Sequence, residues 1–291
     1  MNNYSVKITK RQSDIIKELL KEYNPVFDVI QYSIWRAKAP IFQATYYTSG
    51  KLLIQGKDIS DIAGKINKLL GLEETEQPAI RTDYEKYIGT DESGKGDFFG
   101  PLVIAGVQVS NENKRLFIDL GIKDSKQLDD KKIKQLAASI KANAVHSVVV
   151  ITPQKYNELY SKFNNLNKLL AWGHARAIEN ILEKSPCKYA LADKFGDESL
   201  IKNALMNKGR EIILNQMVRA EADIAVAAAS ILARAEFVRR MDEMASKYEL
   251  NFSKGASDKV IQQAKIFVDK YSKNRLNEVA KMHFKTVQNI N

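Results

Sequence analysis

The alternation of hydrophobic and polar residues predicts a small, self-contained sheet at the start of the chain. Apolar residues alternate with polar ones in several short stretches, as in strands, and recur at helical spacing in two longer ones. The predicted elements are, in order, a strand at Tyr4–Ile8, a helix at Gln12–Tyr23, strands at Asp28–Ala37, Ile41–Tyr47 and Lys51–Gln55, and a helix at Ile59–Leu70. This order predicts a small α+β domain over residues 1–71 whose sheet is covered on one face.

A second, larger unit follows a polar connection. Residues 72–85 are acidic and polar, contain Pro78 and lack apolar periodicity, so we interpret them as a linker. In residues 86–291 strands alternate with helices. The strands are predicted at Tyr87–Asp91, Leu102–Val109, Val145–Ile151, Tyr189–Ala192 and Ile212–Leu214, and the main helices at Lys131–Ala142, Asn167–Glu183 and Glu221–Lys247. The alternation predicts a layered α/β domain.

Composition narrows the chemistry that the chain can carry. Its formal net charge is +10, with most of the basic excess after residue 85, which favours a polyanionic partner such as nucleic acid. Cys187 is the only cysteine and only three histidines occur, so a metal ion would have to be held by carboxylates, which suits Mg²⁺ or Mn²⁺. The lack of disulfides fits a cytoplasmic protein. The longest apolar run, Ile224–Ala233, is too short to cross a membrane.

The segment from Asp91 to Gly100 carries the most informative chemistry. It reads Asp-Glu-Ser-Gly-Lys-Gly-Asp-Phe-Phe-Gly and directly follows a predicted strand. Two adjacent carboxylates can hold a divalent metal ion, and the glycine N–H groups of the following loop can form a concavity for an anion. The glycine spacing differs from both the dinucleotide-binding fingerprint and the Walker A loop. This segment therefore predicts a divalent metal ion beside a phosphate.

Two further segments bring acids to places where they could join this pair. The predicted strand at Tyr189 ends in Asp193, and ligands gather at such strand ends in α/β sheets. Glu221 and Asp223 open a helix whose alanine-rich body would allow it to lie close to a sheet. Either of them could be the fourth acid. Because four converging carboxylates repel one another, we expect two metal ions about 4 Å apart that support in-line cleavage of a phosphodiester.

Together these motifs resemble the type 2 and type 3 ribonucleases H. The resemblance rests on residues 91–97, on Lys-Asp-Ser-Lys-Gln-Leu at 123–128, on Asp193 and on Ala-Ala-Ala-Ser-Ile-Leu-Ala at 227–233, and it covers most of residues 86–291. It implies a ribonuclease H-like mixed sheet with helices, and metal-dependent cleavage of RNA paired to DNA. The catalytic acids and metal ligands that it implies are Asp91, Glu92, Asp193 and Glu221, with Asp223 as the alternative to Glu221.

The same resemblance implies contacts with the nucleic acid. The implied contacts with the RNA strand are Ser93, Gly94, Lys95 and Gly96, and the implied phosphate contacts are Ser125 and Lys126. Backbone groups of the glycine loop would detect the 2′-hydroxyl, which distinguishes RNA from DNA. His174 is expected on a buried helical face, where packing explains it, but a buried histidine near carboxylates could also transfer protons.

Three features resemble the type 3 enzymes, ribonuclease HIII, more than type 2. Type 3 members carry an N-terminal domain resembling TATA-binding protein, and the element order of residues 1–71 fits one copy of it. The stretch from Tyr156 to His174 also resembles type 3. Type 2 enzymes have a tyrosine that recognises an RNA–DNA junction at the position where this chain has Ala256. In the N-terminal domain, the aromatic residues of the sheet could bind nucleic acid together with the nearby Arg36 and Lys38, although core packing explains about half of them equally well. These aromatic residues are Tyr32, Trp35, Tyr46 and Tyr47.

We therefore expect a two-domain endonuclease that cleaves the RNA strand of an RNA–DNA hybrid and leaves 5′-phosphate and 3′-hydroxyl ends. Two alternatives stay open: a type 2-like enzyme that excises single ribonucleotides from DNA, and a nucleic-acid-binding protein without catalysis. The expected partner is the hybrid duplex, without a membrane, and the expected state is a monomer.

Overall fold

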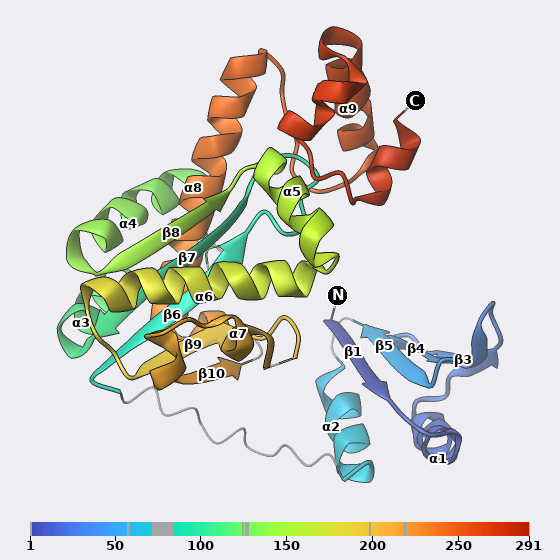
Figure 1. Ribbon diagram of the computed structural model, residues 1–291. Coiled ribbons are helices and arrows are strands. Elements are labelled where there is room, and N and C mark those ends of the chain that lie inside the picture. Colours follow the sequence, from blue (N-terminus) through green and yellow to red (C-terminus); the bar gives the residue numbers. More distant parts are fainter. Residues whose placement is uncertain are drawn as a thin grey trace. The chain divides into compact units, whose positions relative to one another are not determined.

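The computed structural model describes residues 2–56, 59–71, 84–123, 125, 128–197, 199–217 and 220–290. The chain forms two compact units, Met1–Arg81 and Thr82–Asn291 (Figure 1). The division falls inside the segment expected to be a linker, of which residues 72–83 lie outside the described part of the chain. Tyr84 and Glu85, which the sequence assigned to that linker, contact the second unit: the Tyr84 ring stacks on Tyr189 with centroids 3.7 Å apart, and Asn111 N donates to Glu85 O.

The first unit is a five-stranded antiparallel sheet with two helices on one face. Its elements are β1 (Asn2–Lys7), α1 (Lys10–Leu20), β2 (Val26–Asp28), β3 (Ser33–Lys38), β4 (Phe42–Tyr47), β5 (Lys51–Gly56) and α2 (Ser60–Leu69), and the strand order is β1-β5-β4-β3-β2. Trp35 and Ala37 of β3 pack in one core with Ile16 of α1 and Ile66 of α2. Ile34 and Arg36, which alternate with Trp35 and Ala37 along β3, belong to the opposite, uncovered face.

One predicted strand in this unit was wrong. The stretch Asp28–Ala37 was expected to be a single strand, but it contains the end of β2, a turn and most of β3, so the meander has four strands. Tyr32 takes a positive φ of 63° in this turn. Val29 and Tyr32 are apolar yet 69% and 72% exposed, and they extend the strand-like pattern through the turn.

The second unit is built on a five-stranded mixed sheet in the order β10-β9-β6-β7-β8. Its strands are β6 (Lys86–Ser93), β7 (Leu102–Ser110), β8 (His146–Ile151), β9 (Tyr189–Asp193) and β10 (Ile213–Met217). Its helices are α3 (Asn111–Asp119), α4 (Asp130–Asn143), α5 (Pro153–Phe163), α6 (Leu166–Lys184), α7 (Ser199–Ala204), α8 (Ile224–Tyr248) and α9 (Asp258–Tyr271). Strand β6 pairs antiparallel with β7 and parallel with β9.

Helices cover both faces of this sheet (Figure 1). Along β7, Val103 and Ala105 pack in the same core as the alanines of α8, whereas Leu102 and Ile104 pack with α6. Burial on both faces explains why β7 is apolar without alternation. A Cβ on Gly89 of β6 would lie 2.3 Å from backbone atoms of α8, so glycine permits the close approach of this strand and helix.

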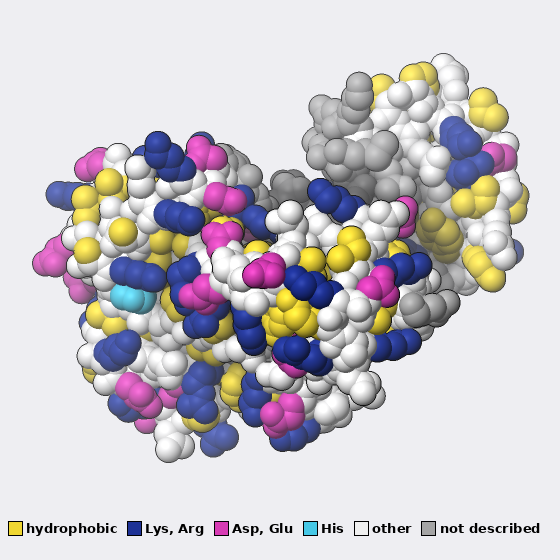
Figure 2. All heavy atoms as spheres, turned by 90° about the horizontal axis from the view of Figure 1, so that it is seen from above, with side chains coloured by type: hydrophobic (Ala, Val, Ile, Leu, Met, Phe, Trp, Pro, Cys, Tyr) yellow, Lys and Arg dark blue, Asp and Glu magenta, His cyan; other side chains and the backbone are white. Residues whose placement is uncertain are grey.

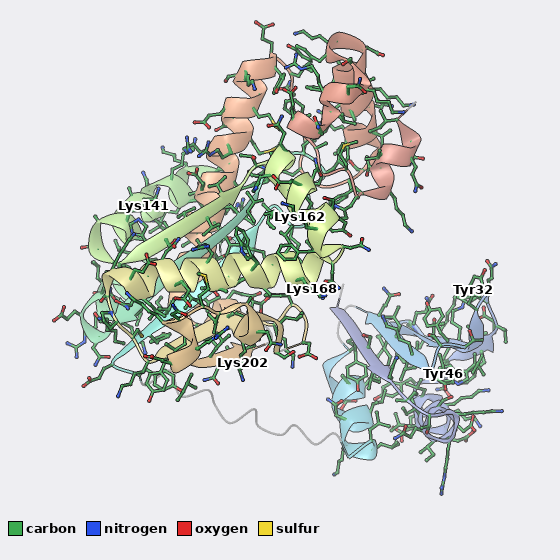
Figure 3. All side chains as sticks on the ribbon, viewed as in Figure 1. Tyr32, Tyr46, Lys141, Lys162, Lys168 and Lys202 are labelled. Atoms are coloured by element: carbon green, nitrogen blue, oxygen red, sulfur yellow. The ribbon has the colours of Figure 1, made fainter. Side chains whose placement is uncertain are left out.

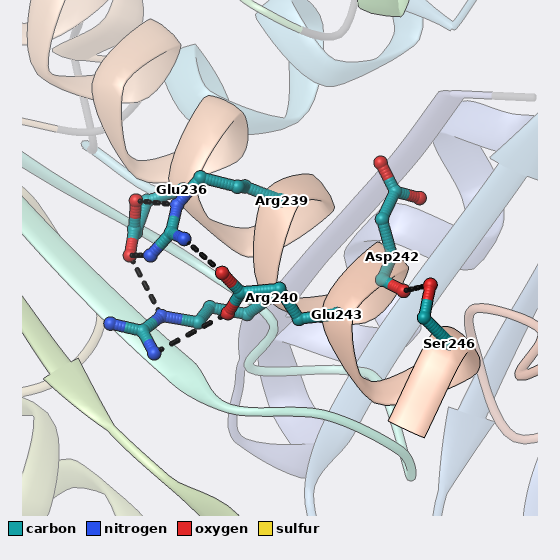
Figure 4. A network of polar contacts seen from close by, with 6 residues as sticks. All are labelled: Glu236, Arg239, Arg240, Asp242, Glu243 and Ser246. Atoms are coloured by element: carbon teal, nitrogen blue, oxygen red, sulfur yellow. Dashed lines mark hydrogen bonds and ion pairs between the residues drawn. The ribbon is translucent and has the colours of Figure 1, made fainter. Parts of the chain in front are cut away.

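The exposed part of α8 carries a network of ion pairs (Figure 4). Glu236 accepts from Arg239 Nε and from Arg240 Nε at 2.8 Å each, and Glu243 pairs with both arginines. Pairs three and four residues apart on a helix surface contribute roughly 0.2–0.5 kcal/mol each. The network therefore supports the helix locally and is not needed to explain its position against the sheet.

Several helices differed from the prediction. Helices α3, α5 and α7 were not predicted. Helix α3 is largely polar and buries only Phe117 as an apolar residue, which explains why its pattern was missed. The helix predicted from Glu221 begins at Ile224 instead, because Asp223 caps it. Among the described residues, no helix is long and apolar enough to span a membrane.

Candidate active site at the ends of β6 and β9

Parallel pairing of two strands brings the first acids together. Asp91 and Glu92 lie near the end of β6, and Asp193 is the last residue of β9. Thr90 is paired with Ala192, so the next residue of each strand, Asp91 and Asp193, emerges side by side at the same edge of the sheet. Adjacent strands lie about 4.8 Å apart, which places these carboxyl groups within interaction distance.

Glu221 is brought to the same edge by a short 3₁₀ turn, Ala220–Ala222. The backbone N–H of Ala220 donates to Asp193 Oδ1 at 3.2 Å, which ties the turn to the end of β9. The charge of Glu221 also raises the pKa of Asp193, so the two acids interact electrostatically.

Asp223 has a different role from Glu221. It is only 7% exposed and is the N-cap of α8, where Oδ1 accepts from Ala225 N at 2.8 Å and from Val226 N at 3.3 Å. Its other oxygen accepts from the Tyr87 hydroxyl at 2.8 Å. Both carboxylate oxygens of Asp223 are therefore already used within the fold.

The pKa values of the acids reflect burial first and the charges of their neighbours second. Burial, followed by the neighbouring charge of Glu92, raises the pKa of Asp91 to about 7. Burial and the charges of Glu221 and Glu92 raise the pKa of Asp193. Burial acts in the same direction on Glu92, but hydrogen bonds and charges from His174 and Lys95 outweigh it and lower the Glu92 pKa to about 2.

The donor chemistry of the site fits a divalent cation. Carboxylate oxygens are the ligands that Mg²⁺ and Mn²⁺ prefer, and a cation would offset the burial and the mutual repulsion that raise the pKa values of Asp91 and Asp193. Across the described part of the chain, no three His, Cys, Asp or Glu side chains already form a metal-binding group. Side-chain adjustment would therefore accompany ligation, with Glu92 starting from its bonds to His174 and Lys95.

His174 belongs to this site although it does not line its surface. It is fully buried on α6, with Nδ1 2.9 Å from Thr90 Oγ1 and Nε2 3.3 Å from Glu92 Oε2. Its ring stacks on Phe195 with centroids 5.1 Å apart. The sequence pattern left packing and proton transfer open for His174, and the fold shows its contact with Glu92.

In the loop after Glu92, one glycine packs against the rest of the fold and the other is exposed to solvent. Gly94 is buried with φ of +87°, and a Cβ there would lie 2.3 Å from Pro101 O and 2.8 Å from the Phe237 ring. Gly96 is exposed, and a Cβ there would meet no atom within 4 Å. Gly96 is therefore the position where an external backbone could approach. Lys95 Nζ lies 3.3 Å from Glu92 Oε1.

The structure describes one of the two phosphate contacts implied by the resemblance. Ser125 is 4% exposed, and its hydroxyl lies 2.8 Å from Ser230 Oγ of α8, so this side chain is occupied within the fold. Arg234 donates to Ser125 O at 2.6 Å. Ser230 also bonds Asp91, a contact that sequence reasoning missed, although a serine within an alanine-rich helix was its signal. Lys126 lies outside the described residues.

Comparisons with known proteins cover both units. Residues 88–287 match the model of the Ribonuclease HII family, and residues 6–88 match a "Domain of unknown function (DUF3378)". Ribonuclease HIII of Protochlamydia amoebophila (strain UWE25) is 41% identical over 264 residues, covering 89% of this chain and 87% of the relative. Ribonuclease HIII of Chlamydia pneumoniae is 38% identical over 291 residues, covering 99% and 97%.

Solved structures also resemble this chain over nearly its whole length. The crystal structure of Bst-RNase HIII in complex with Mn²⁺ has a TM-score of 0.68 and 27% identity, and the match covers 99% of this chain and 98% of that one. The crystal structure of Aquifex aeolicus RNase H3 has a TM-score of 0.58 and 29% identity, and covers 97% and 100%. These matches confirm the fold class expected from the sequence. The chain belongs to the ribonuclease HIII family.

Proposed function

We propose that this chain is a metal-dependent endoribonuclease H that hydrolyses the RNA strand of RNA–DNA hybrids and leaves 5′-phosphate and 3′-hydroxyl ends. The observation that carries the proposal is the convergence of acids from β6, β9 and the 3₁₀ turn before α8, directly beside a glycine loop with an open position at Gly96. Relatives over nearly the whole chain bear the name ribonuclease HIII.

The proposed cofactor is Mg²⁺ or Mn²⁺, with two ions held by Asp91, Glu92, Asp193 and Glu221. A similar structure was solved with Mn²⁺. When bound, such ions lower the pKa of a water molecule and stabilise the leaving oxygen of the phosphodiester. Ser230 and the Glu92 amide hold Asp91 in place, and Ala220 N holds Asp193. His174 and Lys95 hold Glu92 as the charged carboxylate that a metal ion requires.

We propose that the loop Ser93–Gly96 contacts the RNA strand. The N–H groups of an exposed loop can bond a 2′-hydroxyl, and this group is absent from DNA. The nearby Lys95 amine, 5.6 Å from the centre of the Phe195 ring, supplies positive charge for a phosphate. The hydroxyl of Ser125 is already hydrogen-bonded within the fold, so it is a weaker candidate for a contact with the nucleic acid than the backbone of this loop.

We further propose that the first unit binds the duplex through the uncovered face of its sheet. Arg36 and Lys38 lie on that face of β3, and Gln43 and Thr45 are paired with them on β4. Trp35 and Tyr46 belong to the core under the helices, whereas Tyr32 is exposed at the β2–β3 turn (Figure 3). Of the aromatic residues considered for nucleic-acid binding, this leaves Tyr32 and Tyr47 available.

Basic side chains are spread widely over the second unit. Exposed lysines project from α5, α6 and α7, including Lys162, Lys168 and Lys202 (Figure 3). On the face seen in Figure 2, Lys and Arg side chains are interspersed with acidic ones. A dispersed positive charge favours a long polyanion over a single small anion. The monomeric state and cytoplasmic location expected from the sequence are also proposals, which sedimentation and cell fractionation would test.

The direct test is cleavage of a uniform RNA–DNA hybrid in Mg²⁺, with Asp91→Asn as the matched control. The wild-type chain should cut only the RNA strand and stop when the metal ion is chelated. The Asp91→Asn variant should bind the hybrid but not cut it. Binding without cleavage by the wild-type chain would favour the non-catalytic alternative instead.

A further inference from the structure

A lysine is fully buried beneath the glycine loop. Lys281 lies near the C-terminal end of the chain and has no exposed surface. Its Nζ donates to Asp97 O and to Gly100 O, both at 2.8 Å. It also lies 5.6 Å from the centre of the Tyr156 ring on α5. One amine thus bonds both ends of the Asp97–Gly100 turn, which leads from the glycine loop into β7.

The backbone around Lys281 is fixed to the same turn. Lys281 N donates to Phe98 O at 2.9 Å, and Gly100 N donates to Val279 O at 2.9 Å. On the other side, the Asn157 side chain donates to Ala280 O and accepts from Met282 N, each at 2.9 Å. The backbone on either side of Lys281 is therefore hydrogen-bonded to Asn157 of α5.

The turn also carries the segment that contains Ala256. The Asp97 carboxylate accepts from Gly255 N, and Phe98 N donates to Gly255 O at 2.9 Å. Residues Asp97 and Phe98 thus join the glycine loop to the Lys254–Ala256 turn. Lys281 bonds the backbone of both Asp97 and Phe98, so it lies at the point where the two segments meet.

The amine is better explained by positioning than by packing. Removing an amine from water carries a free-energy cost, and an aliphatic side chain of similar length would fill the space without it. Burial accordingly lowers the pKa of Lys281 to about 7. What an aliphatic side chain could not do is donate to the carbonyls of Asp97 and Gly100. The Gly100 carbonyl precedes Pro101, whose own oxygen lies against Gly94, so a shift at Gly100 would reach the glycine loop.

We infer that Lys281 is a positioning residue for the RNA strand: its amine fixes the Asp97–Gly100 turn, and thereby holds the Gly94–Gly96 loop and the Lys254–Ala256 turn in register with each other. The inference rests on the proposed contact between this loop and the RNA strand. Lys281 itself touches no substrate, because it is completely buried.

Steady-state kinetics of Lys281→Met on a uniform hybrid test this inference. Methionine keeps the length and loses the donors, so KM should rise about ten-fold while kcat changes less than about two-fold, as for a lost binding geometry. The matched control is Ile140→Ala, a fully buried residue of α4 in the core that also contains Phe98, which should lower stability without removing a hydrogen bond to the turn. Its KM should stay at the wild-type value. If Lys281→Met does not fold, Lys281→Gln keeps one donor group and should show a smaller rise in KM.

Three outcomes separate the roles. A lower melting temperature for the Lys281 variants with an unchanged KM would overturn the inference and leave Lys281 a purely structural residue. Gly96→Val tests the underlying proposal, since a Cβ at this position would meet no protein atom within 4 Å and the added side chain would obstruct an external strand. If Gly96→Val raises KM but Lys281→Met does not, the inference alone fails. If Gly96→Val leaves KM unchanged, the proposed contact between loop and RNA fails, and the inference fails with it.

Discussion

Two acids only two residues apart, Glu221 and Asp223, have opposite surroundings. Asp223 accepts hydrogen bonds from the first turn of α8 and from Tyr87, so its carboxylate caps the N-terminus of this helix. Glu221 lies in the preceding turn, where its charge acts on Asp193. The same side-chain chemistry therefore serves the fold at one position and the candidate active site at the other.

Substitutions at these two positions should separate activity from stability. Glu221→Gln should reduce hybrid cleavage by about 100-fold or more with little change in melting temperature, because an amide is a poor ligand for Mg²⁺. Asp223→Ala should lower stability by about 1–2 kcal/mol through loss of the N-cap, and Tyr87 would lose its acceptor. Cleavage rates and thermal unfolding of both variants are the measurement. A severe loss of kcat in a well-folded Asp223→Asn variant would instead identify Asp223 as the fourth acid.

Asp193→Asn should abolish cleavage and stabilise the metal-free fold near neutral pH. Because burial and neighbouring acids raise the Asp193 pKa in the folded state, the native chain binds more protons there than the unfolded chain. Wild-type stability therefore falls as pH rises from the ordinary aspartate pKa through the raised one. The variant lacks this loss, so its melting temperature should exceed that of the wild type at pH 7 and approach it below about pH 4. Equal melting temperatures of the wild type and the variant at both pH values would contradict a raised pKa of Asp193 in the folded state.

At the scale of elements, the contact that bears on substrate specificity is the one between the glycine loop and the turn Lys254–Ala256. The turn is bonded to Asp97 and Phe98, and Ala256 is exposed beside the loop. A residue at this position can therefore contact whatever strand the loop binds. An alanine methyl offers neither a ring for stacking on a sugar nor a hydrogen-bond donor.

We expect the enzyme to cut hybrids with several consecutive ribonucleotides and largely to spare a single ribonucleotide within DNA. Recognition would depend on several 2′-hydroxyl contacts made by the loop, and one ribonucleotide offers too few of them. Digestion of both substrates side by side in Mg²⁺ is the measurement, with Ala256→Tyr as the matched variant. Comparable cleavage of both substrates by the wild-type chain would indicate type 2-like specificity.

At the scale of the whole molecule, the two units have separate cores. The first core joins both helices to the five-stranded sheet, and the cores of the second unit are formed entirely by residues after residue 83. The acids of the candidate active site all belong to the second unit. This arrangement allows the second unit to carry out the cleavage while the first unit contributes affinity for the duplex.

Removal of residues 1–81 should leave a folded remainder that binds the hybrid weakly. Tyr84 and Glu85 must be kept, because they contact β9 and α3. We expect metal-dependent cleavage to persist at high enzyme concentration, with KM raised by at least about ten-fold, and a shallower dependence of binding on salt because fewer phosphates would be contacted. Titrations of hybrid against both chains at several salt concentrations measure this. An unchanged affinity would assign the first unit to another partner.

Much of this protein is determined by local sequence. Periodicity alone predicted most strands and the long helices, because burial on one face leaves its spacing in the sequence. The prediction failed at the β2–β3 turn, where exposed Val29 and Tyr32 continue a strand-like pattern, and at α3, where few apolar residues are buried. The motif from Asp91 to Gly96 also indicated a divalent metal ion beside a phosphate, because adjacent acids followed by a glycine loop can be recognised in the sequence without the tertiary structure.

The tertiary structure alone decided which distant residues act together. The pairing of β6 with β9 placed Asp193 beside Asp91, and the cap of α8 separated the role of Asp223 from that of Glu221. The bond of His174 to Glu92 and that of Lys281 to Gly100 cross between elements far apart in the chain. Hydrophobic spacing specifies the face that a residue occupies, but its partner depends on how whole elements pack, and that is a property of the folded chain.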